Sequence, residues 1–136
     1  MAALTVLLTG AAPPPPTVEV HVEGLRNHKG QILVCLTTNP KAFPDCSKDS
    51  ASVRMAVKAA DAASFKVAAP APGTYAIAVV HDENGNNKMD KALFLPKEGF
   101  GFSRNPAITV GPPSFKAASF AVDGDTRQSI KMKYML

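Results

Sequence analysis

The chain has 136 residues, of which 46% are hydrophobic and 19% are charged. This length suits one domain with one core, and the apolar content excludes disorder throughout. The 15 Lys and Arg residues against 11 Asp and Glu give a net charge of +4, but the basic residues are scattered. Nucleic-acid binding requires a clustered basic patch with stacking or groove-reading elements, so we expect no nucleic-acid partner.

The first 16 residues differ in composition from the rest. Residues 1–12 combine a short apolar run with small residues, as in part of a secretory signal that lacks its positive start. The run is too short to span a bilayer, and an ordinary apolar segment is the alternative. A polyproline spacer follows at 13–16. We therefore expect a signal-like remnant and spacer at 1–16 and a single folded domain at 17–136, which is exported to the periplasm or the extracellular space and has no transmembrane segment.

Apolar and polar residues alternate over 17–23, which predicts a strand with one buried face. A continuous apolar run predicts a second strand at 31–38, buried on both faces. A turn bracketed by glycines at 24–30 separates them, so we expect a hairpin. Residues 52–58 alternate weakly and fit either a strand or a short helix.

The second half of the chain continues the β pattern. The predicted strands are 64–68, 73–80, 107–110, 116–122 and 128–136, the last two joined by a turn at 123–125. Between 82 and 102 lies one long irregular loop rich in Gly, Asn and charge, and such loops are usually functional. About seven short strands with turns between them predict an all-β fold, an antiparallel β-sandwich.

Cys35 and Cys46 are the only cysteines. An even count in an exported protein indicates a disulfide, which would close a short loop and stabilise the fold by about 2–3 kcal/mol. Two free thiols are the alternative. No histidine is spaced to complete a zinc site with this pair.

The segment after the 73–80 strand places oxygen atoms in an Asp-x-Asn-x-Asn-x-x-x-Asp array. Its candidate ligands are Asp82, Asn84, Asn86, the carbonyl of Lys88, and Asp90, with Glu98 in place of the Glu that closes an EF-hand loop. The first half of an EF-hand calcium loop has this spacing. The candidate cofactor is thus a structural Ca²⁺. Asp, Asn and Gly are also the commonest turn residues, so a turn without metal stays open.

Three segments in this order, Gly73–Asn86, Pro96–Ser103 and Pro112–Phe115, make the chain resemble a known family. It resembles the bacterial domain of unknown function 2141 over about Val18 to Tyr134. The resemblance implies export and a sandwich of the transthyretin or immunoglobulin-like kind. Because the family has no established activity, the resemblance does not point to a function.

The chain departs from the family pattern at one position of the candidate calcium loop. Family members usually have Gly where this chain has Asn87. An EF-hand-like loop requires a positive φ at this sixth position, and Asn is the best substitute for Gly in that conformation. We therefore expect the loop geometry to survive.

Phe100, Phe102 and Phe115 stand among Gly and Ser in predicted loops. They are a candidate surface for a partner or ligand, although we favour the alternative, a second core cluster beneath the long loop. Our main hypothesis is an exported, non-enzymatic module that binds a protein or cell-surface partner. The first alternative is a small-ligand carrier with its pocket in the 94–115 region.

A hydrolase is the second alternative. His81 could act as a general base with Asp82 or Glu98 as its partner. However, no Ser or Cys lies in a nucleophile context, and no second carboxylate has a convincing spacing. We therefore expect no enzyme.

Overall fold

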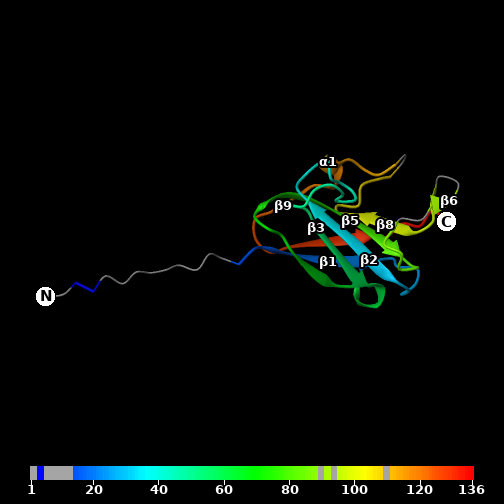
Figure 1. Ribbon diagram of the computed structural model, residues 1–136, viewed down its shortest axis with the longest axis horizontal. Coiled ribbons are helices and arrows are strands. Elements are labelled where there is room, and N and C mark those ends of the chain that lie inside the picture. The colour runs from blue at the N-terminus through cyan, green and yellow to red at the C-terminus, as the bar shows by residue number, and fades with distance from the viewer. Residues whose placement is uncertain (1–2, 5–13, 89–90, 93–94, 109–110) are drawn as a thin grey trace.

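The computed structural model describes residues 3–4, 14–88, 91–92, 95–108 and 111–136. In it two β-sheets pack face to face, with loops and single helical turns at their ends (Figure 1). The predicted all-β sandwich is therefore confirmed. Most of the segment at 1–16 lies outside the described residues, so the proposed domain boundary stays a prediction.

The first sheet has the strand order β10-β1-β4, and the second has the order β3-β2-β5-β8 with β9 beside the start of β5. The strands of the first sheet are β1 (Thr17–Glu23), β4 (Phe65–Ala68) and β10 (Thr126–Lys131). Those of the second are β2 (Gln31–Thr37), β3 (Val53–Lys58), β5 (Gly73–Asp82), β8 (Gly99–Phe102) and β9 (Phe120–Val122). Outside both sheets lie the pair β6 (Lys91–Ala92) and β7 (Leu95–Pro96), the 3-10 turn η1 (Ala59–Asp61) and the helical turn α1 (Phe115–Ala118).

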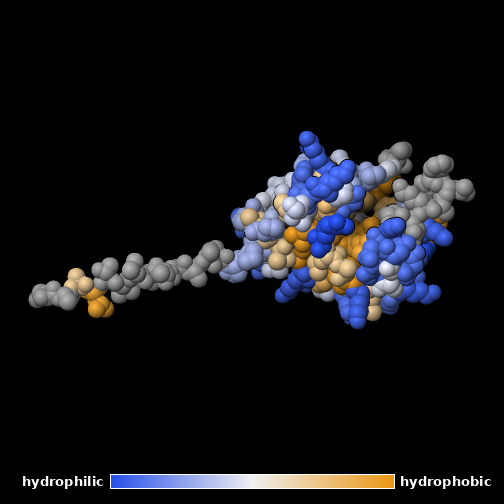
Figure 2. Space-filling view, in the orientation of Figure 1, coloured by the Kyte–Doolittle hydropathy of each residue, from blue (hydrophilic) through white to orange (hydrophobic). Residues whose placement is uncertain are grey.

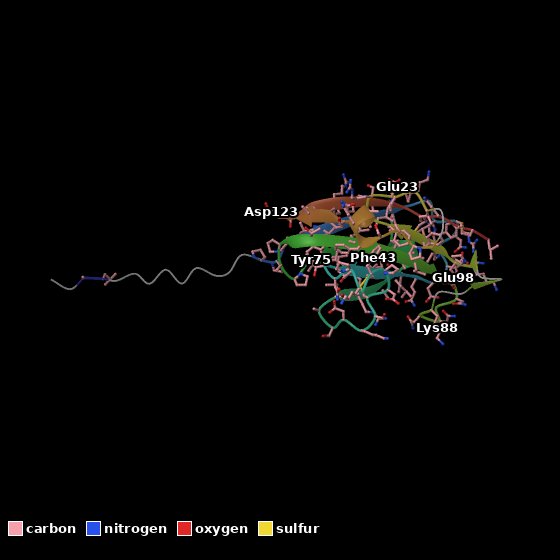
Figure 3. All side chains as sticks on the ribbon, turned by 90° about the horizontal axis from the view of Figure 1, so that it is seen from above. Glu23, Phe43, Tyr75, Lys88, Glu98 and Asp123 are labelled. Carbon is pink, nitrogen blue, oxygen red and sulfur yellow. A yellow bond between two sulfur atoms is a disulfide. The ribbon has the colours of Figure 1, made fainter. Side chains whose placement is uncertain are left out.

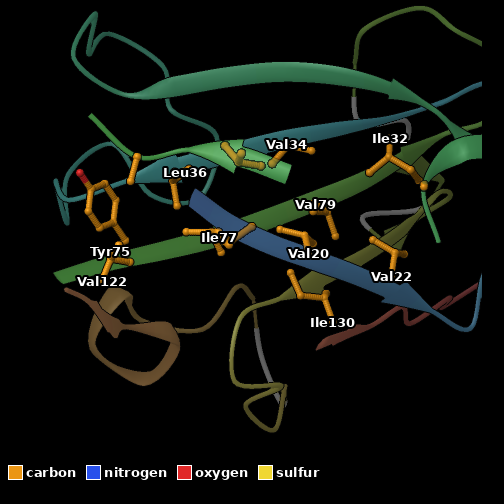
Figure 4. Close-up of a cluster of buried hydrophobic side chains, with 14 of the residues drawn as sticks. Val20, Val22, Ile32, Val34, Leu36, Tyr75, Ile77, Val79, Val122 and Ile130 are labelled. Carbon is orange, nitrogen blue, oxygen red and sulfur yellow. The ribbon is translucent and has the colours of Figure 1, made fainter. Parts of the chain in front are cut away.

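The core lies between the two sheets (Figure 4). Alternation along β1 buries its valines on one face, as predicted, and β2 and β5 supply the facing aliphatic side chains. The fully buried residues at the centre are Val18, Val20, Val67 and Ile130 from the first sheet and Ile32, Leu36, Ile77 and Val79 from the second. Burial of each contributes about 1.5–3 kcal/mol relative to exposure, which fixes the sheets against each other.

The predicted hairpin between 17–23 and 31–38 is wrong. β1 pairs with β4 and, in parallel orientation, with β10, whereas β2 pairs with β3 and β5. The segment 24–30 therefore crosses from one sheet to the other. A segment of this length can connect two strands of different sheets as well as two strands of a hairpin, and the sequence pattern contains no signal that distinguishes the two connections.

Several boundaries also differ from the predictions. The segment predicted at 52–58 forms a strand over Val53–Lys58 rather than a helix, and the predicted 73–80 strand continues to Asp82. Residues 107–108 are not in a strand, and 109–110 lie outside the described residues. Residues 115–118 form α1, because the Ser114 side chain accepts the Ala117 N–H and caps a helical turn.

The two long sides of the sandwich differ. After β10 the chain pairs with β8, where Phe100 and Lys133 exchange backbone hydrogen bonds of 3.0 and 2.8 Å. This bridge ties the two sheets together on one side. On the other side β3 and β4 each end their sheet, and no described strand pairs with their outer edges. The free edge of β3 borders the site described next.

Candidate functional site

The second sheet carries an apolar groove on the face that points away from the core. Leu33 of β2 lies opposite Ala56 of β3 on one side and Val80 of β5 on the other. Leu33 and Val80 are only partly buried, and they line a groove of about 500 Å³. Figure 2 shows an apolar surface over this part of the sheet, bordered by hydrophilic residues. A hydrophobic floor with a polar rim is the usual anatomy of a binding surface.

A disulfide-linked loop forms the wall at one end. Cys35 and Cys46 are bonded to each other, as predicted, and this bond holds the 39–52 loop over the sheet. Pro44 and Asp45 of that loop line the groove. The wall is therefore tied covalently to the floor.

A second core cluster supports this wall from below. Phe100 and Phe102 are each only 6% exposed, and the ring of Phe43 lies 5.8 Å from that of Phe102 and 6.1 Å from that of Phe115. This is the core cluster that we favoured from the sequence. Of the three predicted surface residues, only Phe115 is partly exposed. None of them lines the groove.

The candidate calcium loop lies at the opposite end of the groove, where Asn87 lines it. The Asp82 carboxylate is fully buried, and it accepts the N–H groups of Asn86 at 3.2 Å and Asn87 at 2.8 Å. The side-chain amide of Gln31 donates to both Asp82 and Asn87. Asn87 has a φ of 61°, the left-handed conformation predicted for this position.

The next candidate ligands continue the same pattern. Asn84 Oδ1 accepts the Asn86 N–H at 3.2 Å, and Asn86 Oδ1 accepts the Lys88 N–H at 2.9 Å. An amide oxygen has two lone pairs, so these bonds are compatible with a cation contact as well as with a turn. Figure 3 shows Lys88 and Glu98 at the same end of the molecule. Glu98 is buried.

Asp90 lies outside the described residues. Among the described ones, no three His, Cys, Asp or Glu side chains gather closely enough to hold a metal ion. The calcium site thus stays a prediction.

The base of the loop is held by a buried histidine. His81 is fully buried, with Nε2 2.8 Å from the Lys29 carbonyl and Nδ1 2.8 Å from the Tyr134 hydroxyl. A carbonyl only accepts, so Nε2 carries a proton, and in the neutral imidazole Nδ1 then accepts from the Tyr134 hydroxyl. Burial raises the pKa of Tyr134, which keeps the donating proton in place. Both ring nitrogens are therefore engaged in positioning the chain.

An ion pair completes this network. The Arg26 guanidinium donates to both carboxylate oxygens of Glu83 at 2.7 and 2.8 Å and lies 4.6 Å from the centre of the Tyr134 ring. The Arg26 hydrogen bonds hold the pKa of Glu83 at about 2. The network fixes the first residues of the loop, and we did not predict it from the sequence.

A glycine was the available signal for this network. Gly99 pairs with His81 across β8 and β5, and a Cβ atom there would overlap the Tyr134 ring. A glycine inside a strand marks the close approach of another group. The signal for the groove was the two-sided apolar run of β2, whose outward Leu33 is only partly covered.

The fold and site define an all-β sandwich with an apolar groove between a disulfide-linked loop and a polar Asp- and Asn-rich loop. The chain belongs to a family described as an uncharacterised protein conserved in bacteria, domain of unknown function 2141, whose model matches residues 20–131. The family resemblance is thereby confirmed. No curated protein and no solved structure matches the chain, so likeness to transthyretin or immunoglobulin domains stays a prediction. Within the part of the chain that the structure describes, no helix is long and apolar enough to cross a membrane.

Proposed function

We propose that this protein is an exported, non-enzymatic binding module that holds a partner protein in the outer groove of its second sheet. The observation that carries this proposal is the unequal burial of the side chains on the outer face of that sheet. Cys35, Ala78 and Phe102 are buried at one end, whereas Leu33 and Val80 are left partly exposed in the middle. A partner that covers these two side chains gains about 25 cal/mol for each Å² of apolar surface removed from water.

The rim supplies groups for specificity. Arg54 and Asp45 lie at the disulfide end of the groove, and Asn87 lies at the opposite end. Polar rims of this kind fix the orientation of a partner more than they add affinity. The buried positions of Phe100 and Phe102 argue against the alternative carrier, because its pocket was expected around them.

We further propose that the Asp82–Asp90 loop binds Ca²⁺ and so stiffens the groove wall that contains Asn87. The positive φ of Asn87 and the two N–H groups that the Asp82 carboxylate accepts support this. The ligand set has few carboxylates, which corresponds to dissociation constants of about 10⁻⁴–10⁻³ M, as in extracellular modules. The ion would have a structural role in the loop.

A peptide selection tests the binding role. A displayed library of random peptides is selected on the oxidised protein in 5 mM Ca²⁺, and each enriched peptide is then measured by fluorescence anisotropy. Leu33→Lys places a charge on the groove floor and should weaken binding at least tenfold. Ala121→Lys adds the same charge to an exposed position of β9 and should leave binding unchanged. If no enriched peptide distinguishes these two variants, the groove is not the binding surface.

Thermal melting tests the calcium site. A ligand of the native state raises the melting temperature with the logarithm of its concentration. We expect a rise in millimolar Ca²⁺ that Mg²⁺ does not reproduce and that Asn84→Ala combined with Asn86→Ala removes. Equal melting in Ca²⁺ and in chelator would show that the loop is a turn without metal.

A further inference from the structure

The outer edge of β3 has backbone groups without a strand partner among the described residues. The Ala59 N–H donates to the Gly30 carbonyl at 3.1 Å, and this pair continues the register of β3 with β2. Hydrogen-bonded pairs alternate along an antiparallel ladder. Counting back from Ala59, the backbone groups of Val57, Met55 and Val53 are therefore the ones that bond to β2. The N–H and C=O groups of Arg54, Ala56 and Lys58 therefore point away from the sheet.

The side chains of these same three residues belong to the groove face. β3 buries Val53, Met55 and Val57 partly against the core, while Arg54, Ala56 and Lys58 are exposed on the opposite face. A strand added beside β3 would thus pair with residues whose side chains lie on the groove face, and one of them, Arg54, also lines the groove. Its hydrogen bonds and its outward side chains would meet the same part of the molecule.

Ala56 is the small residue of β3 that lies beside Leu33 of the groove floor. Ala56, Leu33 and Val80 form one row across the sheet. An added strand would lie about 4.8 Å from β3 and about 10 Å from β2, from the spacing of neighbouring strands. A large aromatic side chain opposite Ala56 can lean over it and reach Leu33. The groove volume of about 500 Å³ accommodates such a ring.

Charge identifies the rest of the partner segment. Arg54 and Lys58 stand two residues on either side of Ala56, so they flank the position of the aromatic ring. Opposite charges across a strand pair are stabilising, and like charges are destabilising. Acidic residues two positions before and after the aromatic residue would therefore face the two cations.

The same charges disfavour a second copy of the chain. Antiparallel pairing of two β3 strands about Ala56 would place Arg54 of one copy opposite Lys58 of the other. Natural proteins protect exposed edges with such cations. The edge therefore repels itself while it attracts an acidic strand.

One carboxylate near the edge opposes this attraction. Asp45 lines the groove together with Arg54. Hydrogen bonds from Ser47, with a smaller effect of Arg54, lower the pKa of Asp45, so it is ionised at neutral pH. Removing the negative charge of Asp45 should strengthen binding of an acidic segment, so the direction of this change tests the charge argument.

We propose that β3 binds an extended segment of a partner protein by strand addition, with an aromatic residue over Ala56 flanked by acidic residues two positions away on each side. This inference rests on the proposed binding role and names the chemistry of the partner. Recognition by strand addition obtains affinity from the main chain and specificity from alternate side chains. The required pattern is acidic-x-aromatic-x-acidic.

The test uses a labelled peptide, Ser-Glu-Thr-Phe-Thr-Glu-Ser, and fluorescence anisotropy with the full-length oxidised protein. We expect saturable binding that weakens with added salt, because exposed charges are screened. Replacing both Glu by Lys, replacing Phe by Ser, or methylating the backbone nitrogens of the peptide should each weaken binding at least tenfold. Asp45→Asn should tighten it.

A charge exchange supplies the decisive control. Arg54→Glu combined with Lys58→Glu should lose the acidic peptide and gain the Lys-containing one. Amide NMR signals of Arg54, Ala56 and Lys58 should shift on binding, since their N–H groups gain acceptors. Binding without these shifts, or binding insensitive to the charge exchange, would overturn strand addition.

Two further outcomes also contradict the inference. A concentration-dependent dimer that the acidic peptide does not dissociate would show that a second copy occupies the edge. Failure of this peptide, while library peptides still bind in a Leu33-dependent way, would refute the acidic-aromatic pattern and leave the binding role intact. Failure of both would refute the binding role itself.

Discussion

Replacing Tyr134 with Phe should destabilise the protein mainly through the hydrogen bond that His81 loses. The substitution removes the hydroxyl and keeps the ring, so the packing of Arg26 over the ring and the contact with Gly99 remain. His81 Nδ1, which now accepts from the hydroxyl at 2.8 Å, would lose its donor. Because His81 is fully buried, water does not replace that donor in the closed fold.

The expected cost follows from this geometry. A buried acceptor without a donor costs about 1–3 kcal/mol. The hydroxyl also accepts the backbone N–H of Arg26 at 3.2 Å. That site is exposed, so this N–H can bond to water instead. We therefore expect a loss of about 1–3 kcal/mol in the free energy of unfolding, almost all of it from His81.

Urea unfolding at neutral pH measures this loss. The midpoint should fall while the slope with urea stays unchanged, since the surface exposed on unfolding is the same. Nitrogen NMR of His81 should show a protonated Nε2 and an unprotonated Nδ1 in the wild type. A loss below about 0.5 kcal/mol, or a proton on Nδ1, would refute the hydrogen-bond assignment.

Two other stability predictions follow from the ion pair and the disulfide. The pKa of Glu83 falls from 4.5 to about 2 on folding, so its contribution is complete above pH 4.5 and is lost as the pH falls toward 2. Since Arg26 is 37% exposed, we reduce this contribution to about 1–2 kcal/mol. Glu83→Gln should lower the free energy of unfolding by that amount at pH 7 and should reduce its further fall between pH 4.5 and 2. An equal fall in the variant and the wild type would contradict the assignment. Replacing Cys35 and Cys46 together by Ala should cost about 2–3 kcal/mol in urea unfolding, because the bond limits the unfolded chain, and an equal midpoint would show that the loop is held without it.

The sequence determined strand identity well and strand pairing poorly. Alternation placed the valines of β1 inward, and the β-branched run of β5 marked its central strand. Both are local properties of a few residues. Pairing depends on which segments meet in space, and the segment 24–30 fits a crossing as well as a hairpin. The same limit applies to the groove, because partial exposure of Leu33 depends on how far the 39–52 loop extends over the sheet.

β8 was missed for a physical reason that concerns the site directly. Its Gly-Phe-Gly-Phe sequence is typical of a loop, since Gly is depleted in strands. At Gly101 a Cβ atom would lie 2.6 Å from an isoleucine methyl group of β10, and at Gly99 it would meet Tyr134. The absent side chains let β10 and the C-terminal segment close this side of the sandwich and let Tyr134 reach His81. Closure on the β8 side leaves β3 and β4 as the free edges, so the glycines of β8 help to determine which edge remains open for a partner.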